Sequence, residues 1–468
     1  MPDSVPRLEL LVISHTHWDR EWYHPADRFR QRLIPLIDEI LDDPPARGES
    51  FLLDGQAIVL DDYLAVRPER AAELSALLRD GRLEAGPWYV LADELIPGGE
   101  ALVRNLLAGQ GVLRRLRGES PPVLYCPDSF GHPAILPELA GGFGCELVVL
   151  WRGYGGPRWP TGDTVRWRGP TGQQVIVHHL LPDGYEFGSS LPIDPAASVE
   201  RWGRIASVME PRTTTGAALL LNGADHHARQ LGQHEAVSAL ADAARPSVVR
   251  ATTLREAATS ILEHARNAPL RVIEGELRDS YGYTWTLQGT LGTRAAQKRR
   301  NAVAERVFVR DAEPWIALTA TGGNPAVRAL LAAAWRTLLR GHPHDTLCGT
   351  SIDAVATAFD ARLTSAMVQI DGLRDDAVPT LLGHDSALAR AEINAWQPVV
   401  VLRNPAARAR SGVAELQLST TVANVAVGPG SADRQGISQR IPRWRVSGVP
   451  LQILGRGERV ALTEDPRA

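Results

Sequence analysis

Short apolar runs alternate with helical stretches from residue 8 to about residue 265, and this order limits the possible folds more than any other feature. Strand-length runs separated by helix-length segments indicate parallel strands joined by helices. Residues 164–179 interrupt the alternation and predict a β-hairpin that turns at Gly169-Pro170-Thr171-Gly172. We therefore predict a mostly parallel sheet or barrel, in which the loops after the strands carry the chemistry. The predicted strands are 8–13, 51–53, 82–90, 123–125, 145–150, 217–221 and 247–250, with helices near 67–79, 100–116 and 253–266.

The second half of the chain has a different pattern. Helical stretches at 295–309, 324–339 and 352–373 follow one another without strands and predict a helical bundle. Past Trp396, residues 399–402 and 413–418 resemble antiparallel strands, and the Gly-, Ser- and Arg-rich stretch 428–440 predicts a mobile loop. We expect an α/β-barrel domain at 1–275, a helical-bundle domain at 276–388 and the start of a β-sandwich region at 389–468.

The composition is that of a soluble globular protein and argues against several kinds of partner. The 468 residues suffice for two or three domains, and 44% hydrophobic with 22% charged residues is typical of a soluble globular protein. A formal charge of −4 provides no basic surface for nucleic acid, and three scattered cysteines argue against a disulfide framework. No signal-peptide pattern is present, and no apolar run approaches the ~20 residues of a membrane span. We expect a cytoplasmic protein with neither nucleic-acid nor membrane partners.

The first polar motif, Ser14–Trp22, directly follows the first apolar run. Because side chains alternate along a strand, His15, His17 and Asp19 can converge just past its end. Imidazole and carboxylate groups are ligands that suit a divalent ion such as zinc. The motif predicts a metal site; the alternative is a polar loop whose histidines bond to the backbone.

Two more polar motifs follow strands. Asp128 comes just after 123–125, where a barrel enzyme presents a catalytic carboxylate; the alternative is that Asp128 caps a helix that begins near Ala134. Asp225 belongs to the cluster Asn222–His227 at the end of 217–221, and a plain loop is the alternative there.

The fourth motif, Gly341–Thr350, lies between two predicted helices and contains His344 and Asp345. It suits a loop that donates a ligand from a second domain; the alternative is a helix–helix turn in which Asp345 or Thr350 caps the next helix. Together the four motifs supply two or three histidines and three aspartates. That set is sufficient for one metal ion and two carboxylates that act as acid, base or nucleophile.

With these motifs the sequence resembles glycoside hydrolase family 38, the class II α-mannosidases, and most closely its bacterial cytoplasmic members similar to mannosylglycerate hydrolase. The resemblance covers about residues 8–420 and implies a seven-stranded α/β barrel, a helical bundle and the start of a β-rich region. Family members continue for several hundred residues as β-sandwich domains, so we expect the β region here to be truncated.

The resemblance also implies roles for individual residues. It makes Asp128 the nucleophile and Asp225 the acid/base, although the family's second aspartate of that loop is Ala224 here. Trp22 would form the floor of the sugar pocket, Asp345 would contact substrate, and His15 would support the site from outside the metal shell. The implied zinc ligands are His17, Asp19, Asp128 and His344.

The implied activity is metal-dependent hydrolysis of terminal α-D-mannosides with retention of configuration, with one zinc ion per chain that cobalt or manganese could replace. Linkage preference is not encoded in the motifs, and self-association stays open because family members are often dimers or tetramers. One alternative is an inactive or incomplete carbohydrate-binding remnant of such an enzyme. Another is a metal-dependent amidohydrolase or phosphoesterase, of which the bridging-lysine type is disfavoured because the single lysine, Lys298, lies outside the barrel.

Overall fold

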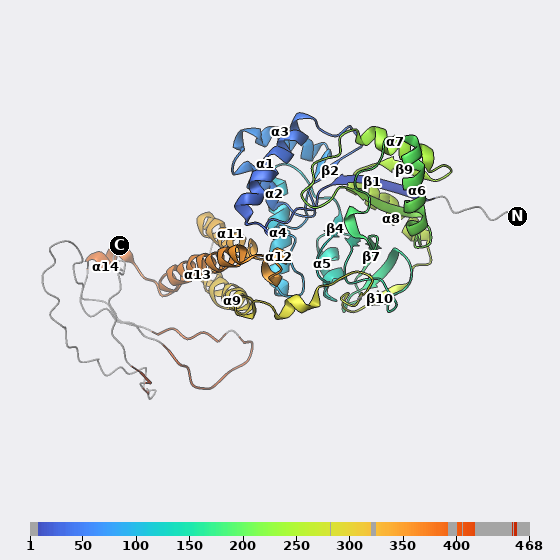
Figure 1. Ribbon diagram of the computed structural model, residues 1–468. Coiled ribbons are helices and arrows are strands. Elements are labelled where there is room, and N and C mark those ends of the chain that lie inside the picture. The colour runs from blue at the N-terminus through green and yellow to red at the C-terminus, as the bar shows by residue number, and fades with distance from the viewer. Residues whose placement is uncertain are drawn as a thin grey trace. The chain divides into compact units, whose positions relative to one another are not determined.

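The computed structural model describes residues 8–280, 282–319, 324–391, 400–404, 406–416, 452 and 454–455. The chain divides into two compact units, Met1–Asp376 and Ala377–Ala468. The first unit contains two β-sheets with their covering helices and most of the helical part (Figure 1).

The first sheet is built around β1 (Glu9–His15), which pairs in parallel with β2 (Phe51–Leu52), β8 (Ala217–Asn222) and β9 (Val248–Ala251). β3 (Leu83–Glu84) extends the sheet beyond β2. The apolar residues of β1 are almost completely buried and alternate between two separate hydrophobic clusters. β1 is therefore covered on both faces, which explains why its sequence is continuously apolar.

The second sheet has the order β10-β6-β7-β5-β4. Its strands pair in parallel except for the β6–β7 hairpin, whose position confirms the predicted hairpin. The described strands thus form two five-stranded sheets, and a closed seven-stranded barrel is not confirmed. The strands are β4 (Val123–Cys126), β5 (Leu147–Leu150), β6 (Thr164–Arg168), β7 (Gln174–His179) and β10 (Val272–Glu274).

Helices cover the sheets, and most bury one apolar stripe. In α8 the buried residues include Leu254, Ala258, Ile261 and Ala265, at spacings of three and four, and the Thr253 hydroxyl caps the helix by accepting from Glu256 N–H. These helices are α1 (Ala26–Asp42), α2 (Ile58–Leu64), α3 (Ala71–Arg79), α4 (Gly99–Arg115), α5 (Leu136–Gly142), α6 (Pro195–Met209), α7 (Gln233–Ala243) and α8 (Leu254–Asn267). Short 3₁₀ segments cover Pro68–Arg70, Gly184–Glu186 and Gln288–Gly292.

The helical part begins with α9 (Ala295–Arg306), which continues through a π-helical segment, Val307–Ala312, into α10 (Glu313–Thr319). α11 (Pro325–Leu339), the short α12 (His344–Cys348) and α13 (Asp353–Leu381) follow. In Figure 1, α9, α11 and α13 lie together at one end of the first unit. The three helices predicted for this region are confirmed. Among the described residues, no helix is both long and apolar enough to cross a membrane.

In the second unit, the helices among the described residues are the end of α13 and α14 (Ser386–Ala391). The strands predicted at 399–402 and 413–418 fall partly outside the described residues, and the described positions 400–402 and 413–416 have no strand. The loop predicted at 428–440 lies outside the described residues.

Candidate active site

The polar motifs meet beyond the carboxyl ends of three strands. His17 and Asp19 follow β1, Asp128 follows β4, and Asp225 follows β8. His17 forms an isolated parallel bridge with Asp225, which holds the loops after β1 and β8 side by side. His344, the first residue of α12, reaches the same point because Pro343 bridges to Ala92.

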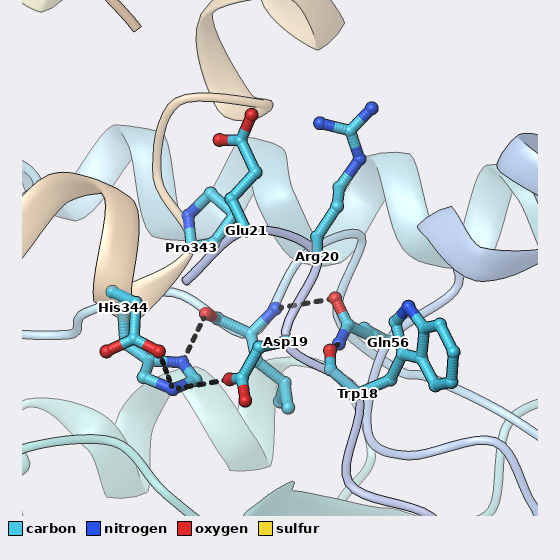
Figure 2. A pocket seen from close by; sticks show the side chains of 9 residues that line it. Trp18, Asp19, Arg20, Glu21, Gln56, Pro343 and His344 are labelled. Atoms are coloured by element: carbon cyan, nitrogen blue, oxygen red, sulfur yellow. Dashed lines mark hydrogen bonds and ion pairs between the residues drawn. The ribbon is translucent and has the colours of Figure 1, made fainter. Parts of the chain in front are cut away.

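The centre of the site is a buried cluster of His17, Asp19 and His344. Their potential ligand atoms all lie within 4.8 Å of one another. Oδ1 of Asp19 is 3.2 Å from Nε2 of His17 and 3.2 Å from Nε2 of His344. Figure 2 shows His344 pointing toward Asp19, with Gln56 and Trp18 on the other side of the pocket.

Asp128 completes this cluster. Its Oδ2 lies 3.4 Å from Nε2 of His344, and its Oδ1 accepts a 2.5 Å hydrogen bond from Nε of Arg152. The alternative role as a helix cap is wrong, because α5 starts at Leu136 and its first turn has no side-chain cap. Two histidines and two aspartates therefore meet where the sequence predicted a metal centre.

The outer nitrogen of each histidine ring faces an oxygen outside the cluster. Nδ1 of His17 lies 3.0 Å from Oδ2 of Asp54, and Nδ1 of His344 lies 3.3 Å from the carbonyl oxygen of Leu91, to which it can donate. Asp54 is itself fixed, since its carboxylate accepts from the backbone N–H groups of Trp18 and Gly55. Both Nε2 atoms are thereby directed at Asp19, as second-sphere partners orient metal-binding imidazoles.

Three atoms at the centre of the cluster lack a hydrogen-bond partner. Nε2 of His17, Nε2 of His344 and Oδ1 of Asp19 are buried and unsatisfied. Burial opposes charging of His17, but the carboxylates of Asp54 and Asp19 outweigh it and raise the pKa of His17 well above its usual value. Leaving buried polar atoms without a partner costs folding free energy. A cation bound between these three ligand atoms would satisfy all of them. The residues therefore fit a divalent metal ion.

Asp225 lies in a different environment from Asp128. Its Oδ1 accepts a 2.9 Å hydrogen bond from the Tyr185 hydroxyl. Burial raises the pKa of Asp225 to about 6. For Asp128, burial also acts upward, but the neighbouring Arg152 and His344 outweigh it and lower the pKa. The pKa values of the two carboxyl groups are thus shifted in opposite directions.

The other predicted site residues, Asp345, Trp22 and His15, differ in their contacts with the cluster. Asp345 is buried, with Oδ2 3.7 Å from Nε2 of His344, and it accepts from the Thr350 hydroxyl. Trp22 is partly buried, and its ring lies edge-on to Tyr23 with 5.0 Å between centroids. His15 is outside the cluster, because its Nε2 bonds to the Tyr185 carbonyl at 3.1 Å. Of the two positions considered for His15, the structure therefore has the one that the resemblance implied, outside the metal shell.

Sequence reasoning missed Tyr185 and Arg152, and it gave Asp54 no role. Arg152 comes two residues after the end of β5, so its position past a strand was an available signal. Tyr185 lies in a 3₁₀ segment with no motif around it, and its contact with Asp225 depends on folding alone.

The buried carboxylate of Glu21 ties the loop after β1 to α12, which carries His344, and to α13. Glu21, 1% exposed, accepts from both terminal nitrogens of Arg362 on α13 and from the Thr346 hydroxyl on α12. Glu21 is two residues past Asp19 and Thr346 is two residues past His344, so their hydrogen bond connects two of the predicted metal-binding segments.

Arg362→Met is expected to lower the free energy of unfolding by about 3–5 kcal/mol, because it leaves the Glu21 carboxylate buried without its partner. Chemical denaturation measures the change. Arg300→Met, which breaks the exposed pair of Arg300 on α9 with Asp360 on α13, is the matched control and should cost under about 1 kcal/mol. Equal losses in the two variants would contradict the assigned role of Glu21.

Two family models match the chain. The model described as "Glycosyl hydrolases family 38 N-terminal domain" matches residues 7–257, and the one described as "Alpha mannosidase middle domain" matches residues 285–381. The first covers both sheets except β10, and the second covers α9 to α13.

Individual proteins agree with these models. The "Putative mannosylglycerate hydrolase" of Halalkalibacterium halodurans is 34% identical over 371 residues, which cover 75% of this chain and 40% of the relative. The crystal structure of an alpha-mannosidase from Enterococcus faecalis superposes with a TM-score of 0.74 at 30% identity, covering 81% of this chain and 43% of that chain. A second Enterococcus faecalis structure, of a protein in glycosyl hydrolase family 38, has a TM-score of 0.66 at 25% identity and covers 81% and 41%. This chain thus spans about two fifths of the length of these relatives.

Proposed function

This chain belongs to glycosyl hydrolase family 38, and from that premise we propose that it hydrolyses terminal α-D-mannosides with a bound divalent metal ion and with retention of configuration. The observation that carries the proposal is the convergence of His17, Asp19, Asp128 and His344. Both family models describe glycosyl hydrolases of this type, so the amidohydrolase and phosphoesterase alternatives have no support.

His17, Asp19, Asp128 and His344 would hold one metal ion, and their unsatisfied buried atoms support this assignment. Zinc is the expected ion, and cobalt or manganese could replace it because this ligand set discriminates weakly. When bound, the ion would supply a Lewis-acid contact that orients hydroxyl groups of the sugar.

In the proposed mechanism Asp128 attacks the anomeric carbon while Asp225 gives its proton to the leaving oxygen. Arg152 and His344 lower the pKa of Asp128 and so favour the ionised form that a nucleophile needs. Burial raises the pKa of Asp225, which favours the protonated form that an acid needs. In the second step Asp225 takes a proton from water, and the water oxygen replaces the Asp128 carboxylate at the anomeric carbon. Trp22 and Asp345 would contact the sugar.

Release of p-nitrophenol from p-nitrophenyl α-D-mannopyranoside tests this function. We expect turnover by the zinc-loaded chain, and none with the β-mannoside or the α-glucoside. Binding of metal and mannose without turnover would instead identify a carbohydrate-binding remnant.

Tyr185→Phe is expected to move the alkaline limb of the pH–rate profile upward. Asp225 must be protonated to act as the acid, so activity falls as pH rises through its pKa of about 6. The Tyr185 hydroxyl stabilises the ionised carboxylate and lowers that pKa, so its removal raises the pKa of Asp225. Profiles of kcat/KM for both proteins measure the shift, and a downward shift would contradict the assignment of Asp225.

A further inference from the structure

A buried carboxyl–imidazole pair, Glu94 and His132, contacts the backbone of Arg152, the residue that bonds to Asp128, and the proposed mechanism does not use this pair. Glu94 is 2% exposed and His132 is fully buried. Oε2 of Glu94 lies 2.8 Å from Nδ1 of His132, and Nε2 of His132 lies 3.2 Å from the carbonyl oxygen of Arg152. Cys126 packs beside the pair, so the three side chains form a compact buried cluster.

This cluster is hydrogen-bonded and does not have the spacing of a metal site. Two ligands of a tetrahedral zinc ion at 2.0–2.1 Å lie about 3.3 Å apart, whereas the 2.8 Å contact of Glu94 with His132 is an ordinary hydrogen bond. A carbonyl oxygen only accepts, so Nε2 of His132 carries a hydrogen toward Arg152. Nδ1 then faces a carboxyl oxygen, and that contact requires one further proton shared by the pair.

The backbone around Arg152 is tightly packed. His132 exchanges two backbone hydrogen bonds with Leu277, of 2.9 and 3.0 Å. Gly153 has a φ of +88°, and a Cβ there would lie 2.1 Å from the carbonyl oxygen of Leu277. The segments around His132, Gly153 and Leu277 therefore pack with their backbones in direct contact. The imidazole of His132 fixes the direction of the Arg152 carbonyl among them.

The Arg152 side chain continues from this backbone to the site. Its Nε donates to Oδ1 of Asp128 at 2.5 Å, and its Nη1 donates to the carbonyl oxygen of Trp285 at 2.6 Å. The guanidinium also lies over the Trp151 ring, 4.1 Å from the centroid. A displacement of the Arg152 backbone would therefore change how the guanidinium meets Asp128.

We propose that Glu94 and His132 are positioning residues that fix the backbone of Arg152 and, through its guanidinium, the carboxylate of Asp128. Both side chains are buried, so neither is exposed to a substrate. The catalytic consequence rests on the proposed function, in which Asp128 is the nucleophile. The physical coupling of Glu94 to the Arg152–Asp128 contact does not depend on it.

The side-chain Nε–H of Arg152 reports this coupling without any activity measurement. In ¹⁵N-labelled protein, an Nε–H bound to a buried carboxylate exchanges slowly with solvent, and Arg152→Met identifies its cross-peak. Glu94→Leu is expected to shift or abolish that peak, whereas Glu94→Gln keeps it because an amide can still donate to Nδ1. An unchanged peak in Glu94→Leu would overturn the proposal. His132→Asn, which withdraws the N–H from the Arg152 carbonyl, makes the same comparison if Glu94→Leu fails to fold.

Glu84→Leu is the matched control, since Glu84 is a buried carboxylate away from the site that bonds to the Ser50 hydroxyl and the Leu254 N–H. It should lower Tm without altering the Arg152 peak or kcat.

A double-mutant cycle tests the catalytic consequence. Glu94→Leu is expected to lower kcat by about 10- to 100-fold with little change in KM, as losses of supporting partners typically do. In the Arg152→Met background the same change should cost nothing more, because Glu94 acts through Arg152. Equal losses in both backgrounds would indicate a merely structural role and overturn the proposal. A wild-type chain without turnover would contradict only the proposed function, because the Nε–H comparison stands by itself.

Discussion

Asp128→Ala should lower kcat for α-mannoside hydrolysis by at least about 10³-fold, as expected for loss of a nucleophile. The structure supports this because Asp128 Oδ1 accepts from Arg152 and Oδ2 faces His344, so the carboxylate is both ionised and fixed. Steady-state kinetics on p-nitrophenyl α-D-mannopyranoside measure the loss.

The isosteric Asp128→Asn should be nearly as inactive, which separates loss of the nucleophile from loss of volume. Asp163→Asn is the control, since Asp163 is a buried carboxylate that bonds to Thr164 and Thr214 outside the site. Retention of more than a tenth of the activity in Asp128→Ala would contradict the nucleophile assignment.

Removal of the metal is expected to abolish turnover, and His344→Ala should prevent reloading. Nε2 of His344 lies within 3.4 Å of carboxylate oxygens of both Asp19 and Asp128. Its loss therefore removes the one predicted metal ligand that comes from the helical part of the chain. Because an ion that binds only the folded state stabilises it, zinc at 100 times its Kd should add about 2.7 kcal/mol to the free energy of unfolding. Elemental analysis and thermal unfolding with and without zinc measure both effects.

His342→Gln is the control for this prediction. His342 is as buried as His344, but its ring bonds to Asn301 and does not face the cluster. It should retain one metal ion per chain. Full metal content in His344→Ala, or full activity after exhaustive chelation, would contradict the metal centre.

The sequence predicted the elements of the fold better than their arrangement. The apolar runs located β1, β4, β5 and β8 because a buried parallel strand is continuously apolar. The partners of β1 could not be predicted, since β8 and β9 lie more than 200 residues away and no local pattern encodes that pairing. Helix α1 was missed although Phe29, Leu33, Leu36 and Ile40 form a buried stripe, because Pro35 interrupts the pattern.

The candidate site could be predicted where its polar residues stand close together in the sequence. His17, Asp19, Asp128 and His344 each stand in a dense polar motif, and the resemblance brought the motifs together. Tyr185 and Arg152 carry no such motif, and their importance depends on which carboxylate each one meets in the folded chain. Residues that tune a neighbour's protonation are set by tertiary contact and are therefore seen only in the structure.

The most direct test of the account follows the first sugar released from p-nitrophenyl α-D-mannopyranoside by ¹H NMR, before mutarotation mixes the anomers. A zinc-loaded chain that works through Asp128 and Asp225 as proposed releases α-mannose first, because two displacements restore the configuration. Release of β-mannose first, or no mannose from protein with a full metal site, would contradict it.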